Sequence, residues 1–283
     1  MLRKVRIIIA VVLFCLTTLL FLDFTGVLHW LAKIQFVPAL LAMNFIVILA
    51  LVALTLLFGR IYCSVICPLG IFQDAVSRIA AKLKKNRFSY SPAISWLRYV
   101  VLVGFVIAIF AGMSALLEPY SAYGRIASNL FAPIYQLGNN LLAYFAERAD
   151  SYMFYSVDVW IKGIATFCIA AATFVIIAVL AWRNGRTYCN TICPVGTVLG
   201  FLSRFSLFKP VMDTEKCNSC GLCASNCKAS CIDYQEYKID YSRCVTCMNC
   251  IEKCNKNAIK YTMRKQTQTA NDTEQSNADN SSR

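Results

Sequence analysis

Charged residues and histidine are scarce in this 283-residue chain. Only 15% of the residues are charged, 58% are hydrophobic, and the mean hydropathy is +0.55. This composition excludes an ordinary soluble domain and indicates a membrane protein with a small polar appendage. The single histidine, His29, cannot supply both axial ligands of a bis-histidine haem. The sequence also has no catalytic triad, phosphate loop or dinucleotide fingerprint, so we expect no hydride-transfer or group-transfer site.

Cysteine, by contrast, is abundant, and near the C-terminus eight cysteines form two copies of the spacing C-x2-C-x2-C-x3-C. This run is typical of bacterial ferredoxins, in which three close thiolates hold one [4Fe–4S] cluster and the fourth crosses to the partner cluster. The predicted ligand sets are Cys217, Cys220, Cys223 and Cys254 for one cluster, and Cys244, Cys247, Cys250 and Cys227 for the other. Zinc is disfavoured because a four-ligand site has no use for a third close cysteine. A disulfide scaffold is disfavoured because the topology predicted below puts these thiols in the reducing cytoplasm.

The flanking residues favour the same interpretation, with two departures. Residues 232–234, 238–241 and 258–261 alternate like short strands beside the cluster loops. Lys228 and Asn255 stand where ferredoxins usually have proline after the fourth cysteine, and a ninth cysteine, Cys231, follows Cys227 by four residues. Either Cys227 or Cys231 could be the crossing ligand, and the spacing favours Cys227.

Four apolar runs are expected to span the membrane, since its roughly 30 Å hydrocarbon layer needs about 20 helical residues. They are residues 7–22, 38–58, 99–117 and 164–182. The first run could instead be a signal peptide, but no A-x-A-like cleavage site follows it, so we prefer an uncleaved span.

Orientation follows from the charges beside these runs. Basic residues gather before the first run, after the second and after the fourth, whereas residues 118–160 carry four acidic and two basic side chains. The positive-inside rule then places both termini and the clusters on the cytoplasmic side of a bacterial inner membrane, with residues 118–160 on the outer side. This asymmetry explains much of the +13 net charge, so nucleic acid is not an expected partner and anionic membrane lipid is.

An internal repeat stands at the membrane surface. Residues 59–70 and 185–196 share the pattern G-R-x-Y-C-x3-C-P-x-G and each follows an even-numbered run. The predicted fold is therefore an all-α anchor of four membrane helices, made of duplicated helical hairpins, plus a small α+β ferredoxin-like domain with two clusters. The expected division is 1–209 for the anchor, 210–263 for the ferredoxin-like domain and 264–283 for a disordered polar tail.

Each repeat predicts a helix that starts at proline, because proline suits the first helical position. After Pro68 the apolar residues recur at steps of three and four, which predicts an amphipathic helix on the inner surface. They are Leu69, Phe72, Val76, Ile79 and Leu83. Cys67 and Cys193 would be cap residues, and the helix dipole with a nearby arginine is expected to lower the pKa of their thiols.

The cysteines of the two repeats are Cys63, Cys67, Cys189 and Cys193. Three interpretations stay open: all four converge on one metal or cluster, each pair cycles between dithiol and disulfide, or all are structural thiols. Duplication of the cysteine pair favours a redox or metal site. Cys15 and Cys168 lack this context and are expected to be core residues.

Together, the two motif types resemble the membrane polyferredoxins of the NapH and NosR type over residues 2–262. The resemblance implies passage of electrons from the quinol pool or cytoplasmic donors towards reductases or assembly factors beyond the membrane. A related branch, the cytochrome oxidase assembly polyferredoxins, is linked to copper handling. The chain has no counterpart of the flavin-bearing domain of larger NosR-like members, so covalent flavin is not implied.

The expected function is that of a membrane-bound iron–sulfur electron-transfer protein, a subunit of a quinol-dehydrogenase-type oxidoreductase and not a complete enzyme. Its expected partners are quinol or a cytoplasmic donor and a reductase or other electron-accepting subunit. The alternatives are a copper assembly factor that reduces copper at the C-x3-C-P cysteines, and a redox-sensing regulator. A quinol site needs a proton acceptor, which His29, Asp23 or Glu118 could supply, although ordinary interfacial polar residues are the simpler interpretation.

Residues 130–146 are too polar for a span and predict a surface helix.

Overall fold

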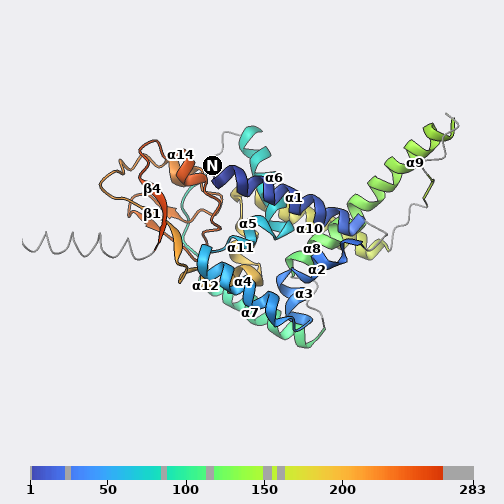
Figure 1. The fold of residues 1–283 in the computed structure, drawn as a ribbon, viewed down its shortest axis with the longest axis horizontal. Coiled ribbons are helices and arrows are strands. Elements are labelled where there is room, and N and C mark those ends of the chain that lie inside the picture. The colour runs from blue at the N-terminus through green and yellow to red at the C-terminus, as the bar shows by residue number, and fades with distance from the viewer. Residues whose placement is uncertain are drawn as a thin grey trace, which may run out of the picture.

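The computed structural model describes residues 2–22, 27–83, 88–112, 118–148, 155–157 and 163–263. A helical body is followed by a small module of short strands and helices at one end, and the N-terminal end of the first helix lies beside that module (Figure 1). The predicted tail and Asp23 lie outside the described residues, as does the side chain of His29.

The elements of the helical body alternate between long apolar helices and short connecting ones. In chain order they are α1 (Leu2–Leu22), η1 (Val27–His29), α2 (Trp30–Lys33), α3 (Phe36–Leu41), α4 (Phe45–Phe58), α5 (Tyr62–Val65), α6 (Pro68–Leu83), α7 (Ser95–Phe110), α8 (Pro119–Ile126), the π-helical η3 (Ala127–Phe131), α9 (Ala132–Arg148), α10 (Ile164–Asn184), α11 (Thr187–Thr191) and α12 (Pro194–Ser203). The helix expected after Pro68 is confirmed, and α9 takes up most of the predicted surface helix.

Of the described helices, α1 and α10 are long and apolar enough to cross a membrane. The run expected at 38–58 is not one helix, because the chain breaks between α3 and α4, where Met43 has φ 50°. The Asn44 side chain then accepts from the Val47 N–H and caps the new helix. The shorter apolar helices α4 and α7 have 14 and 16 residues. The four-helix anchor therefore stays a prediction.

In each repeat, the helix after the cysteine pair packs against the apolar helix that precedes the other repeat. The helix that follows the first cysteine pair, α6, packs against α10, and the one that follows the second pair, α12, packs against α4. Each repeat thus covers the apolar helix of the other, and the core lies between them. Its fully enclosed members include Leu69, Tyr123, Ile126, Ile177 and Leu199.

Helix α6 is turned differently from the predicted surface helix. Gln73, Asp74 and Ser77 on its polar side are buried, whereas Ile79 is 53% and Leu83 70% exposed. The polar side turns inward because Asp74 forms ion pairs there, and burying an unpaired carboxylate would be costly.

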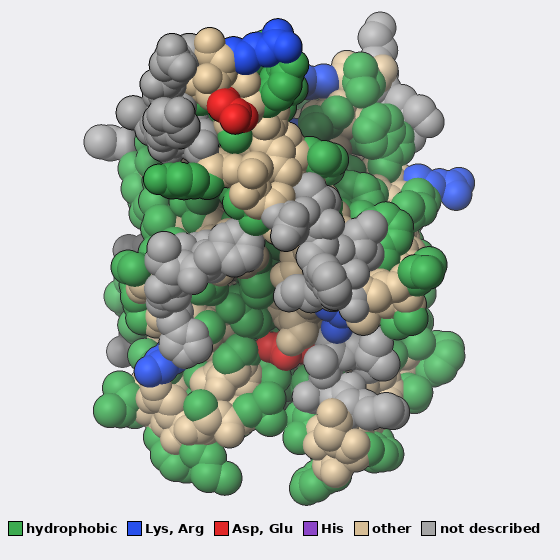
Figure 2. Space-filling view, turned by 90° about the vertical axis from the view of Figure 1, so that its right-hand side faces the viewer, with side chains coloured by type: hydrophobic (Ala, Val, Ile, Leu, Met, Phe, Trp, Pro, Cys, Tyr) green, Lys and Arg blue, Asp and Glu red, His purple; other side chains and the backbone are tan. Residues whose placement is uncertain are grey.

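Apolar side chains cover much of the outside of the helical body. Figure 2 shows the end remote from the module, where hydrophobic side chains predominate over charged ones. Phe110, Ile46 and Ile164 are more than 80% exposed. Cys15 and Cys168 are exposed on α1 and α10, so their assignment as core residues is wrong. The apolar helices direct much of their apolar surface outward, which is typical of a protein that lies in lipid.

The C-terminal module is ferredoxin-like and has two strand pairs. They are β1 (Phe208–Met212) with β4 (Ile259–Met263), and β2 (Ile232–Asp233) with β3 (Lys238–Ile239), both antiparallel. Two short helices, α13 (Leu222–Ser225) and α14 (Asn249–Lys253), pack against each other between the strands. The strand β1 has no counterpart in the sequence analysis, because Pro210 at its centre is unusual in a strand.

Candidate metal centre

The module contains two cavities lined by cysteine. The first, of about 160 Å³, is lined by Cys217, Cys220, Cys223 and Cys254. The second is lined by Cys227, Cys231, Cys244, Cys247 and Cys250. Each cavity therefore gathers the three close cysteines of one motif with the fourth cysteine of the other. The ligand roles themselves stay predictions.

The backbone around the two cavities repeats with the sequence. Ser219 and Thr246, then Gly221 and Met248, then Ser230 and Asn257 stand at matching places in the two motifs. All six have positive φ, between 49° and 70°. Left-handed residues set among right-handed ones curl the backbone into concavities whose N–H groups favour anions. Such loops fit an iron–sulfur cluster, whose thiolate and sulfide ligands are anionic.

Both possible crossing ligands lie in the second cavity. Cys227 and Cys231 are buried, and their sulfur atoms are 3.5 Å apart. The cavity therefore offers one thiol more than a four-ligand cluster needs, and both alternatives from the spacing remain. The first cavity is more open than the second, since Cys220, which lines it, is exposed. We call the first cavity the outer cavity.

The four cysteines of the repeats belong to one buried core cluster of the helical body. Each is 3 to 4% exposed. Cys63 and Cys189 belong to α5 and α11, and Cys193 is the N-cap of α12, where its sulfur accepts from the Gly196 N–H at 3.3 Å. The thiols lie within electrostatic reach of one another, since ionising any of three would raise the pKa of Cys193. We call these four residues the cysteine centre.

The expectation of a lowered thiol pKa is wrong. Burial raises the pKa of Cys189 to about 11 and raises the pKa of Cys67 and Cys193 further. Loss of hydration disfavours the thiolate more than the helix starts and the arginines favour it. Uncharged thiols are therefore the stable form unless a cation is bound.

Two buried arginines cross between the repeats. Arg60 of the first repeat donates to the Cys189 carbonyl oxygen at 3.1 Å, and Arg186 of the second donates to the Cys63 carbonyl oxygen at 2.6 Å. Both arginines are 0% exposed. The two repeats therefore contact each other at the cysteine centre as well as through their helices. Each arginine holds the backbone of the first cysteine of the other repeat.

The pattern shared by the two repeats also needs its last glycine. A Cβ atom on Gly70 would lie 2.3 Å from the Cys63 carbonyl oxygen, and one on Gly196 would lie 2.2 Å from the Cys189 carbonyl oxygen. Neither distance is possible, so glycine lets each proline-started helix pack directly on the helical turn that carries the first cysteine.

A buried ion cluster connects the repeats to the module. Asp74 pairs with Arg186 at 2.8 Å, with Lys228 at 3.2 Å and with Arg6 at 3.7 Å. Lys228 directly follows Cys227, and both Arg6 and Lys228 lie within electrostatic reach of Cys247. One carboxylate thus faces three cations beside the second cysteine cavity. Sequence reasoning missed this cluster, although Asp74 is the only acidic residue between Asp23 and Glu118.

Of the suggested proton acceptors, only Glu118 has a described side chain. It is buried, accepts from the Ser121 hydroxyl at 2.6 Å, and its pKa is raised by burial. Glu118 lies at the start of α8 and belongs to neither the cysteine centre nor the module.

In the parts of the chain that the structure describes, no three His, Cys, Asp or Glu side chains are arranged to hold a single metal ion. The sulfur-lined outer cavity is larger than such a site and fits a polynuclear group with thiolate ligands.

Comparison with known proteins agrees with this chemistry. A family described as "4Fe-4S binding domain" matches residues 40–87 and 166–211, the two segments that hold the cysteine centre. The chain is 26% identical over 190 residues to the "Putative electron transport protein YccM" of Escherichia coli K12, which covers 67% of this chain and 47% of that protein. No solved structure matches.

Two further relatives carry the names of a ferredoxin-type protein and of a regulatory protein. The "Methylamine utilization ferredoxin-type protein MauN" of Paracoccus denitrificans is 25% identical over 60% of this chain and 48% of its own length. The "Regulatory protein NosR" of Stutzerimonas stutzeri is 25% identical over 62% of this chain and 21% of its own length. The chain thus spans about half or less of these three relatives. The family match, the relatives and the cysteine spacing agree, and they support the resemblance of this chain to iron–sulfur polyferredoxins of the NapH and NosR type.

Proposed function

We propose that the chain is a membrane-bound electron-transfer subunit that passes electrons between the quinol pool or a cytoplasmic donor and a partner reductase. Two [4Fe–4S] clusters would be held by the ligand sets predicted above and would supply one-electron transfer when bound. The chain's own residues hold these groups at the membrane surface and connect them to the cysteine centre.

The observation that carries this proposal is the position of Arg60. Its guanidinium lies 4.0 Å from the Cys63 sulfur, and it also donates to the Ser242 carbonyl oxygen at 3.0 Å, two residues before Cys244. One buried side chain therefore contacts both the cysteine centre and the loop of the second cysteine cavity. This proximity supports electron passage between the cysteine centre and the module.

We further propose that α1, α4, α7 and α10 are the four spans, with the module on the cytoplasmic side. Their ends near the module alternate as an up-and-down anchor requires. The starts of α1 and α7 contact it through Arg3 with Glu252 and Arg98 with Ser242. The ends of α4 and α10 contact it through the Phe58 carbonyl oxygen and the Arg186 N–H. The basic residues at these ends agree with a cytoplasmic location.

This topology can be tested with reporter fusions. A reporter that works only in the periplasm should be active when fused near Gln136 and inactive when fused after Met263. Activity after Met263 would place the module outside and contradict the orientation.

The function is tested by loading and reducing the purified protein. Two [4Fe–4S] clusters predict about eight irons and eight sulfides per chain, with a reduced-cluster electron paramagnetic resonance signal after addition of a quinol or of a cytoplasmic donor. About four irons, stoichiometric zinc, or no reduction by any quinol or cytoplasmic donor would contradict the proposal. A variant with Ser at Cys63, Cys67, Cys189 and Cys193 should keep the eight irons if only the module holds clusters, and iron lost from that variant would assign a further cluster to the cysteine centre.

The cysteine centre also favours a second candidate, a copper assembly factor. Four buried thiols are a soft donor set of the kind that selects Cu(I), and because the described side chains are not arranged around a single-ion site, copper would have to draw them together. One copper bound per chain, lost in the four-serine variant with cluster iron unchanged, would favour that function over electron transport.

A further inference from the structure

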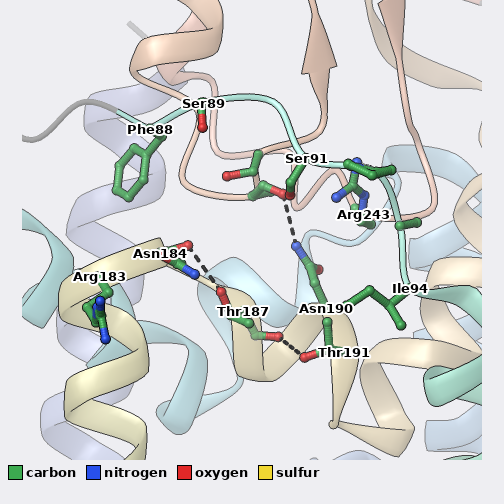
Figure 3. A pocket seen from close by; sticks show the side chains of 14 residues that line it. Phe88, Ser89, Ser91, Ile94, Arg183, Asn184, Thr187, Asn190, Thr191 and Arg243 are labelled. Atoms are coloured by element: carbon green, nitrogen blue, oxygen red, sulfur yellow. Dashed lines mark hydrogen bonds between the residues drawn. The ribbon is translucent and has the colours of Figure 1, made fainter.

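A cavity of about 540 Å³ lies where the helical body meets the module (Figure 3). Its walls are the segment 88–94, the region from the end of α10 through α11, and two pieces of the module. The module contributes Ala229 and Ser230, which stand between Cys227 and Cys231, and Arg243, which precedes Cys244. The cavity is therefore separate from the cysteine-lined cavities but built on the loops of the second one.

The lining is cationic. Among the described residues that line this cavity, two are arginines, Arg183 and Arg243, and none is acidic. Serine hydroxyls from Ser89, Ser91 and Ser230 also line it. Hydroxyl and guanidinium donors around one space are the groups that bind phosphate oxygens.

Arg243 is held ready to bind such a group. Its Nε donates to Asp240 at 2.8 Å, its guanidinium lies over the Tyr90 ring at 5.8 Å, and its side chain is only 5% exposed. Its Nη2 atom is buried and has no hydrogen-bond partner among the residues that the structure describes. Figure 3 shows Arg243 on the side of the cavity next to Ser91. A buried, unpaired N–H of a guanidinium is costly, so a small movement of the Arg243 side chain toward an acceptor in the cavity would be favourable.

The position of the cavity indicates where that acceptor comes from. The apolar helix α10 ends at Asn184, which lines the cavity, and the apolar helix α7 begins at Ser95, directly after Ile94 of the opposite wall. Two helices that direct apolar surface outward therefore stop at the same level as this cationic space. In a membrane this is the level of the lipid headgroups, and basic pockets between helices on the cytoplasmic side bind anionic headgroups.

We propose that this cavity binds the phosphate of an anionic lipid headgroup and thereby joins the ferredoxin-like module to the membrane surface. The proposal rests on the proposed membrane orientation, but lipid binding is measured without electron transfer, so the two can fail separately. Arg243 and Arg183 are the recognising side chains, and Ser91 lines the cavity beside Arg243.

Native mass spectrometry of the detergent-purified holoprotein tests the proposal, with phosphatidylglycerol and phosphatidylcholine of the same acyl chains as probes. We expect one phosphatidylglycerol per chain, bound about tenfold more tightly than phosphatidylcholine, because only the former is anionic. Arg243→Gln and Ser91→Glu should each abolish this preference. Arg204→Gln, at an exposed arginine outside the cavity, is the matched control and should retain it.

Two outcomes would overturn the proposal. Equal binding of the two lipids, or an unchanged preference in Ser91→Glu, would show that the cavity does not recognise the phosphate. Ser91→Glu keeps the Arg243–Asp240 pair, so its result stands even if Arg243→Gln disturbs the module. Competition by glycerol 3-phosphate as strong as that by the lipid would assign the site to a soluble phosphate compound instead.

Discussion

The two repeats share the residues around the cysteines and differ in what lies one step further out. In both, the arginine donates to the carbonyl oxygen of the other repeat's first cysteine, and the last glycine packs on the carbonyl oxygen of the first cysteine of its own repeat. Arg186, however, pairs with Asp74, whereas the other partners of Arg60 are the Cys63 sulfur and the uncharged oxygens of Asn190 and Ser242. The residues that both repeats share, which are the crossing arginine and the last glycine, build the cysteine centre, and we call them the shared half. The partners that differ, Asp74 for Arg186 and Ser242 for Arg60, connect the repeats to the module, and we call them the divergent half.

The divergence follows from two positions. Gln73 and Asp74 of the first repeat correspond, 126 residues on, to Leu199 and Gly200 of the second. A Cβ atom on Gly200 would lie 2.5 Å from the Ser242 carbonyl oxygen, so the module packs on the second repeat where the first repeat carries its carboxylate. The duplicated helices thus contact different parts of the module, and the proposed electron path has no two-fold symmetry.

The largest effects should come from the shared half. Gly70→Ala and Gly196→Ala should each destabilise the protein by about 3 kcal/mol, since a methyl group would meet a backbone oxygen that cannot move away. Thermal unfolding in detergent would measure the loss. Gly138→Ala is the control, because no atom of the described residues outside its own helical turn lies within 4 Å of its Cβ position, and alanine favours a helix. A tolerated alanine at only one of the two repeats would show that the repeats do not share this packing.

Asp74→Asn tests the divergent half. Removing the carboxylate leaves three buried cations without their partner, and breaking a buried ion pair costs about 3 to 5 kcal/mol. Chemical denaturation of the purified protein would measure it. A cost below about 1 kcal/mol, as for exposed pairs, would mean that the ion cluster is not formed.

The same carboxylate predicts a pH dependence. Burial alone would raise the pKa of Asp74, but the charges of Arg186 and Lys228 outweigh it and hold the pKa well below its usual range. Since the pKa is depressed on folding, the stabilisation is fully present above the unfolded value of about 3.9 and is lost as the pH falls below it. Wild type should therefore lose stability below about pH 4 more steeply than Asp74→Asn. Parallel pH profiles of unfolding would contradict this assignment.

A smaller effect is expected on the reduction potential of the second cluster. Cluster potentials respond to nearby charge. Asp74→Asn removes a negative charge and should raise the potential, whereas Lys228→Gln removes a positive charge and should lower it. Redox titration followed by electron paramagnetic resonance would measure both. Shifts of the same sign would indicate structural damage and not electrostatic tuning.

Local signals predicted much of this molecule. The cysteine spacing anticipated which four residues line the outer cavity, and Pro68 and Pro194 anticipated two helix starts. The exchange of α6 and α12 between repeats and the inward turn of Asp74 were not predicted, because both depend on contacts between residues more than 100 positions apart. The thiol pKa was wrong in direction because burial, which the sequence does not show, outweighed the local dipole.

The central claim is that the cysteine centre and the ferredoxin-like module act as one electron path. Its most direct test is the rate at which quinol, or the cytoplasmic donor that reduces the wild type, reduces the clusters in Cys67→Ser, Cys193→Ser and the double variant, with iron content measured alongside. Residues of one unit are non-additive, so each single variant should slow reduction about as much as the double variant does, while about eight irons remain. Reduction at the wild-type rate in all three variants would show that the electron path does not pass through the cysteine centre.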